Sequence, residues 1–268
     1  MARREMAWHR GVMTTNPVAE YFDGVADVYD QVIPFFASFA RQVAGALDLP
    51  PDAQVLDLAA GRGALSRVLA GRAGRMVAVD AAPRMVELLA RDLPAVESHL
   101  MDAAALEFPD ATFDLVVAGF VMHILPDPVA AVAEVRRVLR PGGQFAFTIP
   151  GRADGSPDPW QDPLDELFLE YRKHQVAGTG YRPNHADSEE LLARAGFANV
   201  GRQTLEIAIP VPDGETYWRF TRSHGAGAAI DGMPEDKRAE FHDRIVASVD
   251  AVGGTILRRS ATLTLARR

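Results

Sequence analysis

The sequence of 268 residues predicts an α/β fold: a doubly wound, mostly parallel seven-stranded sheet with an antiparallel last strand, an N-terminal helical lid and helical cap insertions. Three observations carry this prediction. Short apolar segments alternate with helical patterns between residues 53 and 150, as in right-handed βαβ units. Several of these segments are almost continuously apolar, which is typical of strands buried on both faces of a parallel sheet. A glycine-rich turn joins the first of them directly to a helical pattern.

The segment before this alternation is helical. Apolar and aromatic side chains recur at three- and four-residue steps from Tyr21 to Val32, and Pro34 interrupts the pattern before a second helical stretch to about Leu47. We therefore expect residues 1–15 to be a flexible tail and residues 16–50 to be a helical lid.

The alternating part, residues 51–150, is the expected core. The pattern predicts strands near 54–59, 75–80, 96–100, 113–119 and 143–149, and helices near 63–71, 83–92 and 128–139. The run Arg140-Pro141-Gly142-Gly143 separates the last helix from its strand, because Pro stops a helix and Gly supplies the left-handed turn that ends it.

The residue composition changes after Pro150, where a segment rich in Gly, Pro and Asp indicates a loop. Helices are expected near 162–176, 188–195, 214–224 and 234–252, with strands at 198–209 and 260–265. This order divides the second half into a cap insertion at 151–186, a core continuation at 187–209, a helical substrate cap at 210–256 and a last strand at 257–268.

Composition limits the classes of function. The net charge of −8 argues against a nucleic-acid partner, because phosphate binding usually leaves a basic surface. Without cysteine there is no disulfide, thiolate metal site or cysteine nucleophile. No apolar run approaches the roughly 20 residues that span a bilayer, and the basic first residues lack the apolar core of a secretory signal. We expect a cytoplasmic protein whose partners are a small-molecule substrate and, in a homodimer, a second copy of the chain.

The glycine-rich turn lies beside an acidic residue. The first strand ends near Asp57, and Gly61-Arg62-Gly63 follows it. A loop that holds a pyrophosphate uses backbone N–H groups and no nearby carboxylate, whereas a loop beside a carboxylate suits a cationic ligand. The common cationic cofactor that carries a nucleoside is S-adenosylmethionine.

Two more carboxylates follow neighbouring strands. The carboxyl ends of parallel strands meet at one edge of the sheet, so Asp80 and Asp102 are expected to join Asp57 there. Asp80, after the second strand, can accept hydrogen bonds from both ribose hydroxyls. Asp102, after the third strand and followed by Ala103, can accept from the exocyclic amine of adenine.

These residues give the chain its resemblance to the class I S-adenosylmethionine-dependent methyltransferases, in the small-molecule branch that includes the ubiquinone- and menaquinone-type C-methyltransferases. The resemblance covers residues 17–150 well and residues 187–209 fairly. The family's loop, D-x-G-x-G-x-G, is matched by Asp57-Leu58-Ala59-Ala60-Gly61-Arg62-Gly63. Ala59 replaces the first glycine, which is tolerable if φ at this position is negative.

The resemblance implies that S-adenosylmethionine is the cofactor and that Asp80, with Ala81 beside it, holds the ribose. It implies that Asp102 and Ala103 face the adenine. Further cofactor contacts are implied at the rim after the fourth strand and in the N-terminal lid. These contacts are Gly119, Phe120, Tyr21 and Tyr29.

Two other functions remain open at this stage. Gly61-x-Gly63-x-x-Ser66 is a near match to the dinucleotide fingerprint, which would make the protein an NAD(P)-dependent oxidoreductase. A non-catalytic protein that senses or stores S-adenosylmethionine would carry the same loop, and its cap would lack a cavity beside the sulfonium.

Candidate catalytic residues are fewer. His123 follows the fourth strand and is either a base or substrate contact, or a structurally packed histidine. Glu170 and His174 would share one face of the inserted helix, as a catalytic dyad or as a solvated salt-bridge face. No carboxylate–histidine set has metal-ligand spacing, so we predict no catalytic metal.

Aromatic and basic residues are mixed in the cap, where they could bind the acceptor. Arginines and a histidine could clamp an anionic acceptor, namely Arg182, Arg219, Arg222 and His224. Aromatic side chains could line an apolar pocket, among them Trp160, Tyr171 and Trp218. The alternative is a cap helix with its aromatic side in the core and its arginines in water. The expected acceptor is small and partly apolar, a secondary metabolite or an isoprenoid, methylated on carbon or oxygen.

Overall fold

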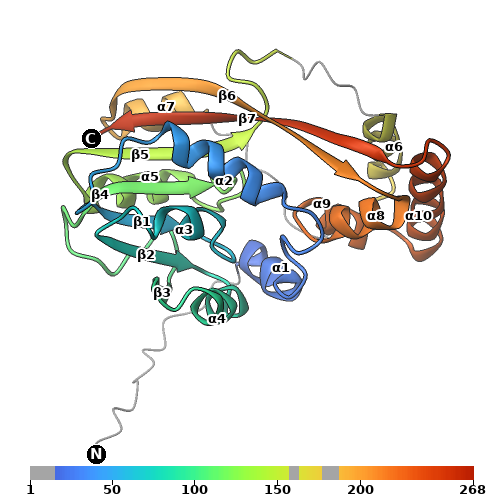
Figure 1. Cartoon of the computed structure of the whole chain (residues 1–268), viewed down its shortest axis with the longest axis horizontal. Helices are drawn as coiled ribbons and strands as arrows, with labels where there is room; N and C mark the ends of the chain where they lie inside the picture. The colour runs from blue at the N-terminus through green and yellow to red at the C-terminus, as the bar shows by residue number, and fades with distance from the viewer. Residues whose placement is uncertain (1–15, 157–162, 177–186) are drawn as a thin grey trace, which may run out of the picture.

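A computed structural model describes residues 16–156, 163–176 and 187–268 of the chain. Its centre is a seven-stranded sheet with the strand order β3-β2-β1-β4-β5-β7-β6 (Figure 1). The strands are β1 Gln54–Leu58, β2 Arg75–Asp80, β3 Glu97–Leu100, β4 Phe113–Gly119, β5 Leu139–Pro150, β6 Ala198–Val211 and β7 Thr255–Arg267. The first five pair in parallel, and β7 runs antiparallel to both β5 and β6, so the predicted fold class is confirmed.

Helices precede, alternate with and follow the strands of this sheet. They are α1 Pro17–Val25, α2 Phe35–Ala46, α3 Ala64–Leu69, α4 Pro83–Asp92, α5 Pro128–Val138, α6 Pro163–Arg172, α7 Ser188–Arg194, α8 Gly214–Arg222, α9 Ala226–Asp231 and α10 Glu235–Asp250. α2 begins at Phe35, directly after the predicted break at Pro34, but α1 already ends at Val25, so the helical pattern expected as far as Val32 continues as turns and not as helix. The tail expected at 1–15 lies outside the described residues.

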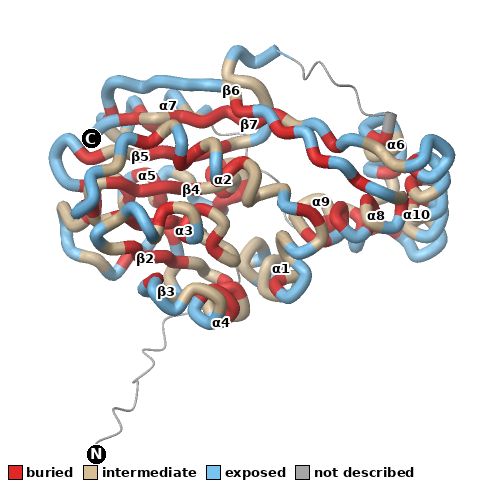
Figure 2. Tube along the Cα trace, viewed as in Figure 1, coloured by how far each residue is buried: buried red, intermediate tan, exposed pale blue. Residues whose placement is uncertain are grey.

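Strand alternation builds a core on each face of the sheet. Val55 and Leu115 face the core that contains α2 and α3, whereas Leu56 and Val116 face the core that contains α5 and α7. Each fully buried aliphatic side chain contributes roughly 1.5–3 kcal/mol. Figure 2 shows the central strands buried, while the first half of β6, at the sheet edge, is exposed.

The cap lies beyond the carboxyl ends of the parallel strands (Figure 1). There, α6, α8 and α10 pack around Phe241, whose ring stacks on Tyr171 and meets Phe168 and Trp218 edge-on. The cap therefore has a small aromatic core of its own, placed at the edge of the sheet where an α/β fold holds its ligand.

Several elements differ from the expected ones, and β7, for example, begins at Thr255 rather than near residue 260. β5 begins at Leu139 rather than near residue 143, because Leu139 already pairs with Phe113 ahead of an irregularity in the ladder. The helix expected to reach residue 176 ends at Arg172. α9 was not predicted; it is short, and its sequence AGAAID carries no clear apolar periodicity.

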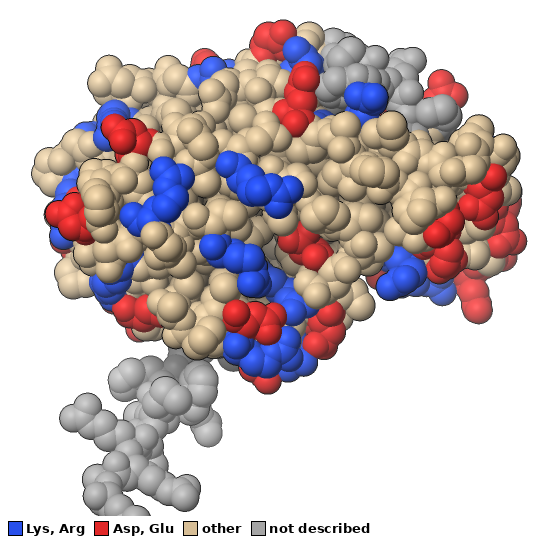
Figure 3. All heavy atoms as spheres, in the orientation of Figure 1, with Lys and Arg blue, Asp and Glu red and all other residues tan. Residues whose placement is uncertain are grey.

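On the face drawn in Figure 3, acidic and basic side chains lie interspersed rather than gathered into one basic surface. Among the described residues, no helix is both long enough and apolar enough to span a membrane.

Candidate active site

The turn after β1 is organised by Asp57. Its side chain is 1% exposed, and its Oδ2 accepts hydrogen bonds from the backbone N–H (2.9 Å) and the hydroxyl (2.7 Å) of Ser66. Burial raises the pKa of the Asp57 carboxyl to about 7. Asp57 thus joins β1 to α3, and it also lines a small pocket under Tyr29 and Phe120.

The backbone of this turn is left-handed at three positions. Gly61 and Gly63 have φ of +55° and +79°, values that glycine adopts readily. Ala59 has φ of +52°, so the condition under which this substitution was expected to be tolerable is not met. Its Cβ costs on the order of 1–2 kcal/mol in this conformation, which the surrounding contacts must offset.

Asp80 closes the same turn from the end of β2. One carboxylate oxygen accepts from Gly61 N (2.8 Å) and the other from Ala82 N (2.9 Å), so the side chain is held in one orientation. Burial raises its pKa. Each oxygen keeps a second lone pair, so Asp80 can still accept from a ligand diol.

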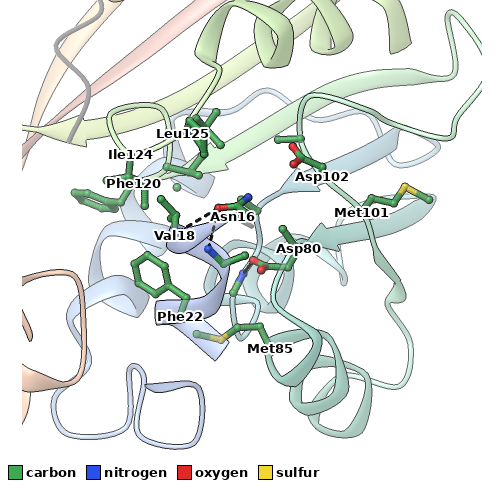
Figure 4. Close-up of a pocket in the computed structure, with 18 of the residues that line it drawn as sticks. Asn16, Val18, Phe22, Asp80, Met85, Met101, Asp102, Phe120, Ile124 and Leu125 are labelled. Atoms are coloured by element: carbon green, nitrogen blue, oxygen red, sulfur yellow. Dashed lines mark hydrogen bonds between the residues drawn. The ribbon is translucent and has the colours of Figure 1, made fainter. Parts of the chain in front are cut away.

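Asp80 lines a pocket together with other predicted cofactor residues. Asp102 lies exposed after β3 and accepts from Ala104 N (2.8 Å), with buried Ala103 beside it. Figure 4 shows Asp80 and Asp102 on one side of the pocket and Phe22, Phe120 and Ile124 on the other. A ligand with a polar nucleoside end and a less polar reactive end fits this division.

The other predicted cofactor residues take different positions. Ala59, Gly61, Ala81, Ala103, Gly119 and Phe120 line this pocket, as does Tyr29, whose ring lies over Gly61 and stacks on Phe36 (4.9 Å between centroids). Phe120 has φ of +55° and donates its N–H to Thr148. Tyr21 does not line the pocket; its hydroxyl donates to the carbonyl of His224 (2.9 Å).

Sequence reasoning missed part of the pocket wall. Asn16 lines it and caps α1 by accepting from the N–H groups of Val18 and Ala19. An Asn followed by Pro is a helix-start signal, which could have placed the helix but not its position over a pocket. The remaining missed residues are apolar, and Figure 4 labels Val18, Phe22, Met85, Met101, Ile124 and Leu125.

A larger cavity of about 1070 Å³ opens between the lid, the sheet edge and the cap. Phe22, Tyr29, Phe120 and Ile124 line both this cavity and the first pocket, so the two adjoin across these side chains. Its walls are rich in aromatic rings: Phe35 of α2 contacts Phe120 of the rim and Phe220 of the cap. The cavity is therefore suited to a flat, partly apolar molecule next to the first pocket.

Two predicted histidines line this cavity. His123 lies in a turn after β4, and its Nδ1 is buried without a hydrogen-bond partner among the described residues. His224 follows α8, and its Nδ1 bonds the carbonyl oxygen of Phe220 (2.7 Å). Burial lowers the pKa of each imidazole to about 4. Both rings are neutral near pH 7, so neither can hold an anion as a cation would.

The other predicted catalytic pair lies away from the cavity. Glu170 is exposed and pairs with Arg244 (2.9 Å), which lowers the pKa of Glu170. His174 lies beyond the end of α6, so the expected common helical face is absent. Neither residue lines the cavity, and the arrangement favours the salt-bridge alternative.

Most of the residues predicted to bind the acceptor molecule lie within the cap or on its surface and not in the cavity. Tyr171 and Trp218 are buried against Phe241. Arg219 is exposed, and Arg222 pairs with Asp231 (2.5 Å). None of these four lines the cavity. Trp160 and Arg182 lie outside the described residues.

Two other arginines do line the cavity. Arg172 ends α6, and Arg259 of β7 pairs with Asp165 (3.1 Å), which also lines it. The alternating pattern that predicts the last strand covers only residues 260–265, so the sequence gives no signal for Arg259. Within the described ranges, no group of three or more His, Asp or Glu side chains could hold a metal ion.

Comparison with known proteins gives a consistent result. A family profile described as a methyltransferase domain matches residues 56–147. A nocamycin O-methyltransferase from Saccharothrix syringae is 29% identical over 258 residues, covering 88% of this chain and 92% of that protein. An uncharacterized methyltransferase from Mycobacterium tuberculosis is 32% identical, covering 66% of this chain and 84% of that protein.

A demethylmenaquinone methyltransferase from Mycolicibacterium vanbaalenii is 38% identical over 134 residues, covering 48% of this chain and 58% of that protein. Among solved structures, the YcgJ protein from Bacillus subtilis has a TM-score of 0.59 at 19% identity, covering 85% of this chain and 97% of that one. At this identity the structural match concerns the fold alone.

Proposed function

This chain belongs to the class I S-adenosylmethionine-dependent methyltransferases, and from that premise we propose that it methylates a small, flat, partly apolar molecule bound between the lid and the cap. The observation that carries the proposal is the shared wall of Phe22, Tyr29, Phe120 and Ile124 between the two cavities. A methyl group presented at this wall would meet an acceptor on the other side.

The residues of the first pocket fit the cofactor. We propose that Asp80 accepts from the ribose hydroxyls and Asp102 from the adenine amine, on the polar side seen in Figure 4. The cofactor supplies an electrophilic methyl group on a sulfonium. The protein aligns the acceptor with that methyl group and excludes water, which lowers the barrier through orientation.

The acceptor class is inferred from the larger cavity. Aromatic rings of Phe35, Phe36 and Phe120 would pack against a flat body, while Arg172 and Arg259 would meet a polar or anionic end. The name of one relative, a demethylmenaquinone methyltransferase, supports a quinone-like acceptor, and the name of another, a nocamycin O-methyltransferase, supports methylation of oxygen. Both O- and C-methylation remain compatible with this cavity.

The non-catalytic alternative required a cap without a cavity beside the sulfonium. A cavity of about 1070 Å³ adjoins the cofactor pocket, which favours an enzyme over a sensor. The oxidoreductase alternative would require a dinucleotide, whereas the chain's family uses S-adenosylmethionine.

The test uses labelled S-adenosylmethionine and a panel of quinones, phenols, indoles and prenyl diphosphates. We expect labelled product from at least one quinone or phenol. Product from prenyl diphosphates alone would contradict the flat acceptor. In parallel, S-adenosylhomocysteine at about a hundred times its Kd should stabilise the fold by about 2.7 kcal/mol in thermal unfolding, and NADH should not.

A further inference from the structure

The ring of His224 is oriented by its surroundings. Its Nδ1 lies 2.7 Å from the carbonyl oxygen of Phe220, and only a protonated nitrogen can donate to a carbonyl. This contact favours the Nδ1–H tautomer, in which Nε2 keeps its lone pair, although the same oxygen also accepts from the N–H and the hydroxyl of Ser223. The ring also stacks on Phe220 (4.4 Å between centroids) and on Phe35 (6.1 Å). In this tautomer the ring has one basic nitrogen, and His224 lines a cavity whose walls include several aromatic rings.

For His123 the surroundings favour the opposite tautomer. Its Nδ1 is buried, and none of the described residues offers it a hydrogen bond. A buried N–H without a partner is rarer in proteins than an acceptor without one, so the Nε2–H tautomer is favoured. His123 would therefore donate a hydrogen bond to a bound acceptor rather than take its proton.

A lid residue holds the backbone of His224. The hydroxyl of Tyr21 in α1 donates to the carbonyl oxygen of His224 (2.9 Å). The approach is close: a Cβ at Gly227 would lie 2.5 Å from that hydroxyl, so a larger residue would push lid and cap apart. Asn16, Val18, Ala19 and Phe22, from the same segment, line the cofactor pocket. One short helix therefore contacts both the cofactor pocket and the residue that faces the acceptor.

We propose that Nε2 of His224 accepts the proton of an acceptor hydroxyl during methyl transfer, and that Tyr21 is the residue that positions it. This inference rests on the proposed function. In the step, the acceptor oxygen forms a bond to the methyl carbon, and the carbon–sulfur bond breaks with its electron pair passing to sulfur. The hydroxyl proton passes to Nε2, and the products are a methyl ether, S-adenosylhomocysteine and an imidazolium that releases its proton to solvent.

The charge around His224 suits this role. Burial lowers the pKa of the imidazole to about 4, and the positive charge of Arg259 acts in the same direction. A neutral imidazole is ready to accept a proton at neutral pH. A weak base suffices, because a hydroxyl oxygen that is forming a bond to a methyl group becomes strongly acidic. The other ionisable groups lining the cavity are Tyr29, His123, Asp165 and Arg172.

The experiment compares two acceptors of different acidity. At neutral pH, 2-hydroxy-1,4-naphthoquinone is already ionised, whereas 1-naphthol keeps its proton. His224→Gln should lower kcat with 1-naphthol by about 10²- to 10⁴-fold, the range for loss of a general base, and should spare the ionised acceptor. Equal losses with both acceptors would overturn the proposal, since a merely structural role would not distinguish them. His242→Gln, which removes a half-buried imidazole outside both cavities, is the matched control.

Tyr21→Phe removes only the hydroxyl that bonds His224. We expect kcat with 1-naphthol to fall about three- to tenfold, the effect of one neutral hydrogen bond, while the variant still binds S-adenosylhomocysteine. An unchanged kcat would overturn the positioning role.

Nitrogen NMR on protein labelled in the imidazole rings gives a second readout that needs no acceptor. We expect His224 to be protonated on Nδ1 and not on Nε2 at neutral pH. An Nε2–H tautomer would overturn the proposal. Failure of the proposed function looks different: the wild-type protein would methylate neither aromatic acceptor, whatever the state of His224.

Discussion

Backbone strain at single residues marks the edge of the cofactor pocket. Ala59 and Phe120, both lining it, have φ of +52° and +55°. Strained non-glycine residues persist where the surrounding structure over-determines them, often at functional sites. At Phe120 the strain accompanies a ring that faces both cavities, and at Ala59 it accompanies the turn that approaches the ligand.

Ala59→Gly should relieve this strain. The left-handed conformation destabilises alanine by about 1–2 kcal/mol. Glycine removes this strain but destabilises the fold by about 0.4–1 kcal/mol, because it raises the conformational entropy of the unfolded chain. The free energy of unfolding should rise by up to about 1.6 kcal/mol, measured by urea unfolding. Ala60→Gly is the matched control. Its φ is not positive, so it should lose about 0.5–1 kcal/mol. Equal effects at the two sites would contradict the assignment of strain.

Asp80 supplies a second prediction at this scale. Replacement by Ala would remove the acceptors of both Gly61 N and Ala82 N, whereas Asp80→Asn keeps one of them and turns an amide NH2 toward the other, so Asn is the milder variant. Loss of a charged acceptor should weaken binding of S-adenosylhomocysteine by about 1.5–3 kcal/mol in calorimetry. Glu107→Gln, an exposed residue outside the pocket, should bind as the wild type does. An unchanged affinity for Asp80→Asn would remove the ribose contact.

Sequence reasoning was strongest for residues at the ends of parallel strands. Asp80 and Asp102 were predicted to converge because the topology brings those strand ends together, and both line one pocket. It was weakest in the cap. Whether Arg219 or Arg172 faces the cavity depends on how α6 and α8 are rotated, which long-range packing around Phe241 sets.

Among the elements, β1, α3 and the turn between them form a unit fastened by one buried carboxyl. The pKa of Asp57, about 7, lies above its ordinary value of 3.8. Between those pH values the folded protein keeps a proton that the unfolded chain has released. The free energy of unfolding therefore falls as pH rises from about 4 to about 7 and levels off above that.

Asp57→Asn should remove this dependence. Between about pH 6 and pH 8, the wild-type protein should lose about 1 kcal/mol more stability than the variant, since one pKa unit corresponds to about 1.4 kcal/mol. Urea unfolding at both pH values measures the difference. Parallel pH slopes for the two proteins would show that Asp57 is ionised throughout. The comparison between proteins cancels the titration of other groups.

A helix or strand could be predicted from the sequence when its own residues carry the pattern that defines it. α4 was expected at 83–92 and runs from Pro83 to Asp92, with Pro at its first position and buried Met85, Leu88 and Leu89 on one face. α9 lacks such a pattern. It fits because Gly227 admits the Tyr21 hydroxyl from a lid helix about two hundred residues earlier, a contact that no local window contains.

At the scale of the whole molecule, the lid connects the two proposed ligand sites. α1 lines the cofactor pocket on one side and bonds the cap through Tyr21 on the other. A cofactor that orders α1 would thereby order the segment that carries His224. Binding of the two substrates should then be coupled through this helix, because the first substrate to bind orders α1 and the second binds to a lid that is already ordered.

Hydrogen exchange can follow this coupling in the complete protein. S-adenosylhomocysteine should slow amide exchange in α1 and also in residues 222–231, which do not line the cofactor pocket. In Tyr21→Phe, protection of α1 should remain while protection of residues 222–231 is lost, because the bond to the His224 carbonyl is gone. α5, which lies against the opposite face of the sheet from α2 and α3, is the internal control. Retained protection of residues 222–231 in the variant would show that the cap responds to the cofactor by another route.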